Sequence, residues 1–114
     1  MNTRFLSEST DGRPIPLIVD DGSSVTTIHS TPAGTATFDR VYLTISNNST
    51  QTRLVTIKFG GTAVPDDFVP FTVAPDDTIQ ALIGQPLQNG LDVSGVADGN
   101  NCNVTGYVER VVAT

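Results

Sequence analysis

The side chains of this chain that could do chemistry are one histidine, one cysteine, two tyrosines and twelve acidic residues. A nucleophilic Cys102 would need a base, but His29 is distant in sequence and no family signature surrounds it. No Gly-x-Ser-x-Gly elbow is present to activate a serine. We therefore expect His29 to cap or pack and Cys102 to lie in or near the core. The sequence predicts a protein that is not an enzyme.

The acidic residues include three adjacent pairs, Asp20-Asp21, Asp66-Asp67 and Asp76-Asp77, all in expected loops. Calcium is bound by several loop oxygens that converge on one ion. Adjacent residues rarely ligate one ion together, and the Asp-x-Asp-x-Asp-Gly pattern of a calcium loop is missing. Two of the pairs stand beside proline, where aspartate commonly initiates turns. We therefore expect turn chemistry, with no metal and no other cofactor.

A sugar site is the other chemistry to consider. Glycoside hydrolysis needs two carboxylates across a cleft, and carbohydrate-binding sandwiches usually present exposed aromatic rings. The chain has no tryptophan, so Tyr42 and Tyr107 are the candidates for stacking on a sugar. Glycan binding is thus an open alternative that the sequence does not support directly.

Composition bounds the remaining possibilities. A chain of 114 residues is one domain by size. Its six Lys and Arg are scattered and its formal net charge is −6, which argues against nucleic acid or an anionic membrane surface as partner. A single cysteine cannot form an internal disulfide. The sequence shows neither a signal peptide nor a stretch long enough to span a membrane, so we expect synthesis in a host cytoplasm.

The clearest structural signal lies between residues 39 and 59. Residues 39–47 and 52–59 alternate apolar and polar side chains, which is the period of a strand with one buried face. With the polar turn 48–51 between them, they predict a hairpin. The side chains expected to face the core are Val41, Leu43, Ile45, Val55, Ile57 and Phe59.

The rest of the chain follows the same pattern of short strands and frequent turns. About eight short antiparallel strands are predicted and no segment has a helical period. Pro70 places residues 68–73 at a sheet edge or a bulge. The expected fold is all-β, a single jelly-roll-like β-sandwich over residues 17–114.

Residues 1–16 differ from the strands that follow. Pro14 and Pro16 fix the backbone around Ile15 and remove donors, so an extended N-terminal arm is expected there. A frayed terminus is the alternative, but the arm carries apolar side chains that favour docking. The residues expected to contact a partner are Arg4, Phe5, Leu6, Arg13 and Ile15.

Several stretches together resemble small structural proteins encoded in the head gene clusters of tailed bacteriophages. The stretches are Phe5–Ile15, Thr26–Ser30, Asp39–Asn47, Phe59–Thr62 with Pro65–Asp67, Pro86–Gly90 and Val104–Arg110. Proteins of this kind include capsid decoration or cement subunits, which are β-sandwiches that bind the outer shell and hold neighbouring capsid proteins together.

The resemblance implies a non-enzymatic cement protein on the capsid surface of a virion, with the major capsid protein as its partner. It also implies a homo-oligomer, with a trimer favoured because cement proteins often occupy local three-fold positions. Deletion of residues 1–16 would then leave the domain folded and weaken capsid attachment. A head–tail or tail structural protein, or a carbohydrate-binding adhesion module, stays open as an alternative.

Overall fold

The computed structural model describes residues 2–113, and in this part of the chain it contains nine strands and no helix. The expected all-β class is therefore confirmed. The strands are β1 (Asn2–Phe5), β2 (Ile15–Pro16), β3 (Thr26–Ser30), β4 (Thr37–Asn47), β5 (Arg53–Phe59), β6 (Phe68–Val73), β7 (Asp77–Leu87), β8 (Asp92–Ala97) and β9 (Cys102–Val112).

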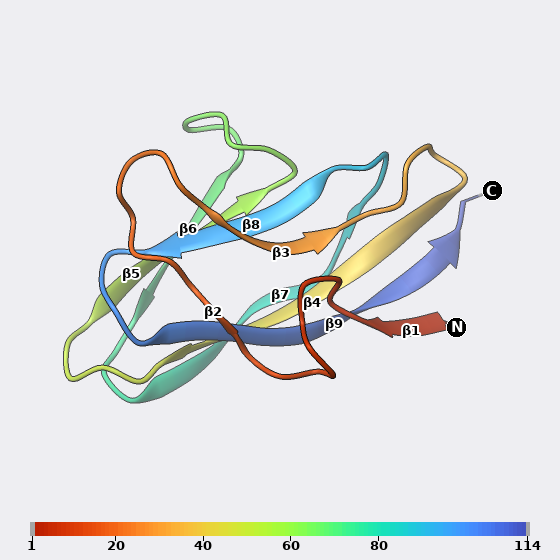
Figure 1. Ribbon diagram of the computed structural model, residues 1–114. Helices are drawn as coiled ribbons and strands as arrows, with labels where there is room; N and C mark the ends of the chain where they lie inside the picture. The colour runs from red at the N-terminus through yellow and green to blue at the C-terminus, as the bar shows by residue number, and fades with distance from the viewer. Residues whose placement is uncertain (1, 114) are drawn as a thin grey trace.

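The strands form two antiparallel sheets packed face to face (Figure 1). Sheet A has the order β1-β9-β4-β7, with β2 also paired to β9, and sheet B has the order β3-β8-β5-β6. Successive strands cross repeatedly from one sheet to the other, as in a jelly roll. The predicted β-sandwich is thus confirmed.

The core lies between the sheets and follows the predicted alternation. Val41, Leu43 and Ile45 on β4 are fully buried, and so are Val55 and Ile57 on β5. A buried aliphatic side chain of this kind stabilises the fold by about 1.5–3 kcal/mol. Cys102, expected in or near the core, is buried at the first residue of β9.

The predicted hairpin between residues 39 and 59 is wrong, because β4 and β5 belong to different sheets. The turn between them crosses the sandwich. The buried side chain of Asn47 fixes this crossing: its Nδ2 donates to the carbonyls of Gln51 and Val73, and its Oδ1 accepts from Ser49 N–H. Each strand of a crossing has one buried face, as each strand of a hairpin does, so the alternation alone cannot separate the two.

Three smaller features concern strand ends and edges. Pro70 lies on β6, which pairs only with β5 and is an edge of sheet B as predicted. Residues 17–19 are apolar, but outside the named strands they contribute a single bridge, Val19 to Ala97. Strand β7 continues to Leu87 through a bulge at Gly84, where φ is +84°.

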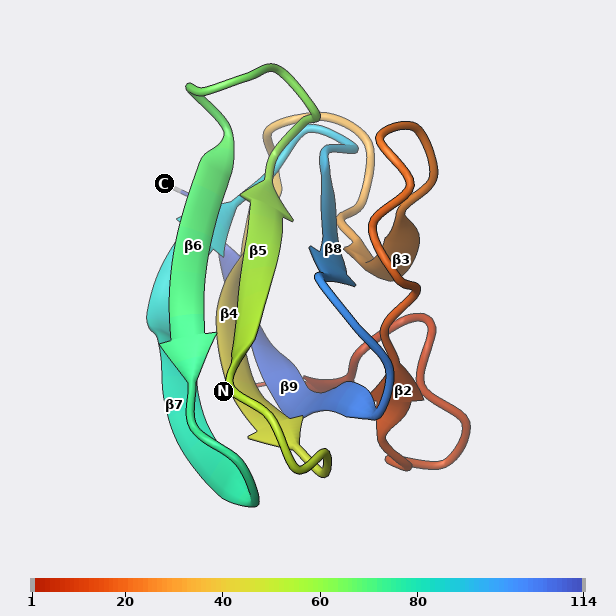
Figure 2. The same ribbon diagram turned by 90° about the vertical axis from the view of Figure 1, so that its left-hand side faces the viewer.

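The N-terminal segment lies along one side of the sandwich, opposite the side formed by β6 and β7 (Figure 2). Its strands β1 and β2 both pair with β9. Between them, Glu8 N–H donates to the carbonyl of Ile28 on β3, at 3.3 Å, so the segment also covers an edge of sheet B. Leu6 and Ile15 belong to the core, with 1% and 7% of their surface exposed. The truncation described above would therefore remove core side chains.

Candidate interaction surface on sheet A

A row of apolar side chains crosses the outer face of sheet A. In the strand register Phe5 on β1 lies opposite Tyr107 on β9, Tyr107 opposite Tyr42 on β4, and Tyr42 opposite Ile83 on β7. Residues directly opposite each other in an antiparallel pair share one face. Phe5 is 65% exposed, Ile83 63% and Tyr107 40%. We call these four residues the apolar band.

The two tyrosines of the band hold each other in place. Their ring centroids are 4.6 Å apart and their planes differ by 10°. On the β7 side, a Cβ atom at Gly84 would approach Tyr42 Oη to 3.0 Å, so the ring packs closely against this glycine. Rings held in this way lose little conformational freedom when a partner docks. One face of each ring is covered by the other, which leaves a sugar less of the open ring face that stacking requires.

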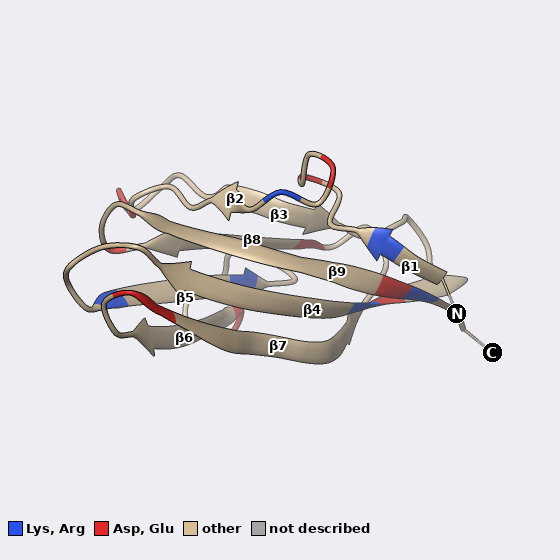
Figure 3. Ribbon diagram, turned by 90° about the horizontal axis from the view of Figure 1, so that it is seen from below, with Lys and Arg blue, Asp and Glu red and all other residues tan. Residues whose placement is uncertain are grey.

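Away from the band, the outer face of sheet A carries almost no charge. Ser46 and Thr78 form a hydrogen bond of 3.1 Å there. The charged residues that the described strands place on this face are Arg40 and Glu109, which lie opposite each other in the register. Figure 3 shows charged positions at one end of β4 and β9 and mostly uncharged strand elsewhere. Few charges and several aromatic rings are characteristic of the centre of a protein interface.

A groove of about 830 Å³ adjoins the band where β4 begins and β7 ends. The guanidinium carbon of Arg40 lies 5.8 Å from the centroid of the Phe38 ring at its wall. Such a recess beside a flat face can receive a side chain that protrudes from a partner. Its lining consists of Thr35, Phe38, Arg40, Gly84, Pro86, Leu87, Gln88, Asn89 and Leu91.

The structure separates the five residues expected to contact a partner into two groups. Arg4, Phe5 and Arg13 are exposed, and Phe5 is the end of the apolar band. Leu6 and Ile15 face the core of their own chain. The first group is available to a partner, whereas the second attaches the N-terminal segment to the sandwich.

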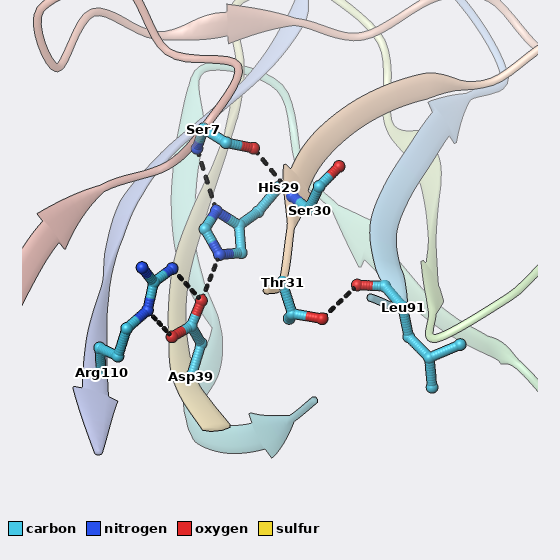
Figure 4. A network of polar contacts seen from close by, with 7 residues as sticks. All are labelled: Ser7, His29, Ser30, Thr31, Asp39, Leu91 and Arg110. Atoms are coloured by element: carbon cyan, nitrogen blue, oxygen red, sulfur yellow. Dashed lines mark hydrogen bonds and ion pairs between the residues drawn. The ribbon is translucent and has the colours of Figure 1, made fainter. Parts of the chain in front are cut away.

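A polar network with a buried centre joins this segment to both sheets (Figure 4). His29 on β3 is 2% exposed, and its Nδ1 accepts from Ser7 N–H at 3.0 Å. Its Nε2 therefore carries the proton and donates to Asp39 Oδ2 on β4, at 2.7 Å. Arg110 on β9 donates to both Asp39 oxygens, at 2.8 and 3.0 Å. We call Ser7, His29, Asp39 and Arg110 the His29 network.

The charge state of Asp39 follows from its partners. Burial is the largest single influence and favours the neutral acid. The hydrogen bonds from Arg110 and His29, together with the positive charge of Arg110, outweigh it and hold the pKa of Asp39 below its ordinary value of 3.8. The same contact raises the pKa of Arg110. Asp39 is thus a paired, ionised group within the fold.

Serine, histidine and aspartate also make up hydrolytic triads, but their geometry differs here. In a triad the serine hydroxyl donates to the histidine. Here the backbone N–H of Ser7 bonds to His29, while Ser7 Oγ accepts from Ser30 N–H at 2.8 Å. Nδ1 and the hydroxyl each accept from a backbone N–H group, and Nε2 bonds to the Asp39 side chain. The arrangement is suited to connecting β3, β4, β9 and the N-terminal segment.

The acidic loops show the turn chemistry expected of them. Asp20 Oδ1 accepts from Gly22 N–H, and Asp21 Oδ1 accepts from the N–H groups of Ser23 and Ser24. The backbone bonds from Ser24 and Ser23 lower the pKa of Asp21 to about 2. Within residues 2–113, no three His, Cys, Asp or Glu side chains are grouped as metal ligands.

No protein-family model, curated protein or solved structure matches this chain. Over the residues that the structure describes, no helix has the length and apolar character needed to cross a membrane. What bears on function is therefore the physical character of the apolar band, the groove beside it and the His29 network.

Proposed function

We propose that the protein is a non-enzymatic decoration protein of a bacteriophage capsid. It binds the major capsid protein through the outer face of sheet A and stabilises contacts between neighbouring capsid subunits. The apolar band is the observation that carries the proposal, because it places four aromatic or aliphatic side chains, three of them exposed, on a face with almost no charge. The resemblance of the sequence to small head proteins of tailed phages supports the choice of partner.

The dimensions of sheet A suit this role. β4 and β9 each contain 11 residues, which is about 36 Å of strand at ~3.3 Å per residue. Four strands spaced ~4.8 Å apart cover about 19 Å, so the face offers up to about 700 Å². Standard protein interfaces bury roughly 600–1,000 Å² on each partner. The face is therefore large enough for a specific contact.

Cement action follows from mass action. A protein that binds only the assembled shell stabilises it by RT ln(1 + [L]/Kd), which is about 2.7 kcal/mol per site at a concentration 100 times Kd. A rigid sandwich transmits this stabilisation to whichever subunits it bridges. Many copies on one shell multiply the effect.

The test is co-sedimentation with phage heads that lack the protein, followed by heating of those heads. The wild-type chain should bind saturably and raise the disruption temperature. Ile83→Asp places a charge in the apolar band and should weaken binding at least tenfold, because an interface cannot bury an unpaired carboxylate cheaply. Leu54→Asp is the matched control, since Leu54 is 45% exposed on the outer face of sheet B.

The outcomes separate the candidate roles. Equal loss of binding in both variants would show that the contact is not specific to the outer face of sheet A. Absence of wild-type binding to heads would overturn the capsid role, and binding to isolated tails instead would assign the protein to the tail. Saturable binding on a glycan array would favour the adhesion alternative.

A trimer is part of the same proposal. Strand β7 is an edge of sheet A, and its residues Thr78 to Leu87 carry no charge that would discourage pairing with another strand. Closed three-fold symmetry would place this edge against a neighbouring copy. Light scattering on the purified protein should give three times the monomer mass of 12.0 kDa. A monomeric mass at micromolar concentration would remove the trimer from the proposal.

A further inference from the structure

The His29 network depends on a neutral imidazole. His29 Nδ1 accepts from Ser7 N–H, and its Nε2 donates to Asp39 Oδ2. A neutral imidazole supplies one acceptor and one donor, whereas a protonated one supplies two donors. A proton on Nδ1 would face Ser7 N–H, which is 3.0 Å away, and neither group could then accept.

The surrounding charges determine which hydrogen bond of His29 breaks when the ring is protonated. Asp39 from β4 and Arg110 from β9 form a two-point ion pair, so the negative charge of Asp39 is already compensated when His29 becomes positive. On the N-terminal segment, the charged residues nearest to Ser7 in sequence are Arg4 and Glu8, and both are exposed. Asp39 stays ionised well below neutral pH because its pKa is lowered. Mild acidification is therefore expected to break the hydrogen bond between His29 and Ser7.

The segment that carries Ser7 has few other attachments on this side. All four residues of β1 are exposed, and β1 is held by its pairing with β9. After it come the buried side chain of Leu6, the bond from Ser7 N–H to His29, the bond from Ser30 N–H to Ser7 Oγ at 2.8 Å and the bond from Glu8 N–H to the carbonyl of Ile28 at 3.3 Å. Ser7 thus makes two of the contacts that tie the segment to β3.

We propose that the His29 network is a pH-dependent attachment for the N-terminal segment. Protonation of His29 releases residues 7 and 8 from β3, while Leu6 stays in the core and the rest of the sandwich stays folded. Histidine is the side chain that most commonly changes charge on mild acidification, which is the condition under which release is expected.

Amide hydrogen exchange measured by NMR on the full chain tests the proposal. Protection factors, corrected for intrinsic exchange at each pH, are compared at pH 7.5 and pH 5.5. The protection of Ser7 and Glu8 should fall at least tenfold at pH 5.5, while that of Val41 to Ile45 in β4 should stay constant. Constant protection at Ser7 would overturn the proposal. A parallel fall in β4 would also overturn it, because that indicates global unfolding.

Two variants separate this mechanism from general acid sensitivity. His29→Gln keeps one acceptor and one donor on an uncharged group, so the pH dependence at Ser7 should disappear. Ser7→Pro removes the donated N–H and should leave Glu8 poorly protected at both pH values. A pH-dependent fall of wild-type size in His29→Gln would refute the role of His29. If that variant does not fold, wild-type-like, pH-dependent protection of Glu8 in Ser7→Pro would refute it instead.

Discussion

Replacing Leu6 by alanine should destabilise the protein strongly, although Leu6 lies in the segment that the sequence presents as an arm. Leu6 is 1% exposed and packs with the core of the sandwich. Almost the full cost of a buried Leu→Ala change therefore applies, which is the lost transfer free energy and the cavity left behind. Together these amount to about 3 kcal/mol.

The thermal shift follows from the size of the chain. At about 2.1 cal/mol/K per residue, 114 residues give an unfolding entropy of about 0.24 kcal/mol/K. A loss of about 3 kcal/mol then lowers Tm by about 12 °C. Differential scanning calorimetry and urea unfolding measure the two quantities independently.

Leu54→Ala is the matched control for this measurement. It makes the same chemical change at a side chain that is 45% exposed, so the expected cost is about 1 kcal/mol or less. If Leu6→Ala costs no more than Leu54→Ala, Leu6 does not belong to the core in solution. The N-terminal segment would then be a removable arm.

Two further predictions concern sheet A. Asp39→Asn should lower the free energy of unfolding by about 3–5 kcal/mol at neutral pH, because it leaves the guanidinium of Arg110 without a countercharge. Since the folded pKa of Asp39 lies below 3.8, its ionised form stabilises the fold above that value. The difference between wild type and variant should shrink as the pH falls from 3.8 through the folded pKa, which urea unfolding at stepped pH would detect, and a constant difference would contradict the assignment. Gly106→Ala should prevent folding or cost more than about 4 kcal/mol, because its Cβ would collide with the backbone carbonyl of Tyr42 on the neighbouring strand. Circular dichroism and thermal unfolding of this variant beside Thr105→Ala would test it, and equal stability of the two would refute the close approach.

The strands and their buried faces could be predicted because the side-chain period of a strand is local information. Val41 and Ile57 are buried as the alternation indicates, and Pro70 lies on an edge strand. The partner of each strand could not be predicted in the same way. The turn at residues 48–51 has the composition of a hairpin turn, and only the buried Asn47 distinguishes it as a crossing.

The candidate site was predictable only in part. Phe5 stood out as an apolar residue in an irregular segment, and Tyr42 and Tyr107 stood out as candidate sugar platforms. Their meeting in one band depends on the register of β9 against both β1 and β4, which no local pattern encodes. Asp39 and Arg110 are 71 residues apart, so the network that they form with His29 could not be predicted from the sequence either.

The strand order has a consequence for how the molecule is made. In sheet A, β9 lies between β1 and β4, and in sheet B, β8 lies between β3 and β5. A central strand of each sheet is therefore among the last parts of the domain to leave the ribosome. Until residues 92–112 emerge, β3 and β5 lack their partner β8, and β1 and β4 lack their partner β9. The nascent chain must be kept from aggregating during that interval, and folding that depends on such distant pairings is slow.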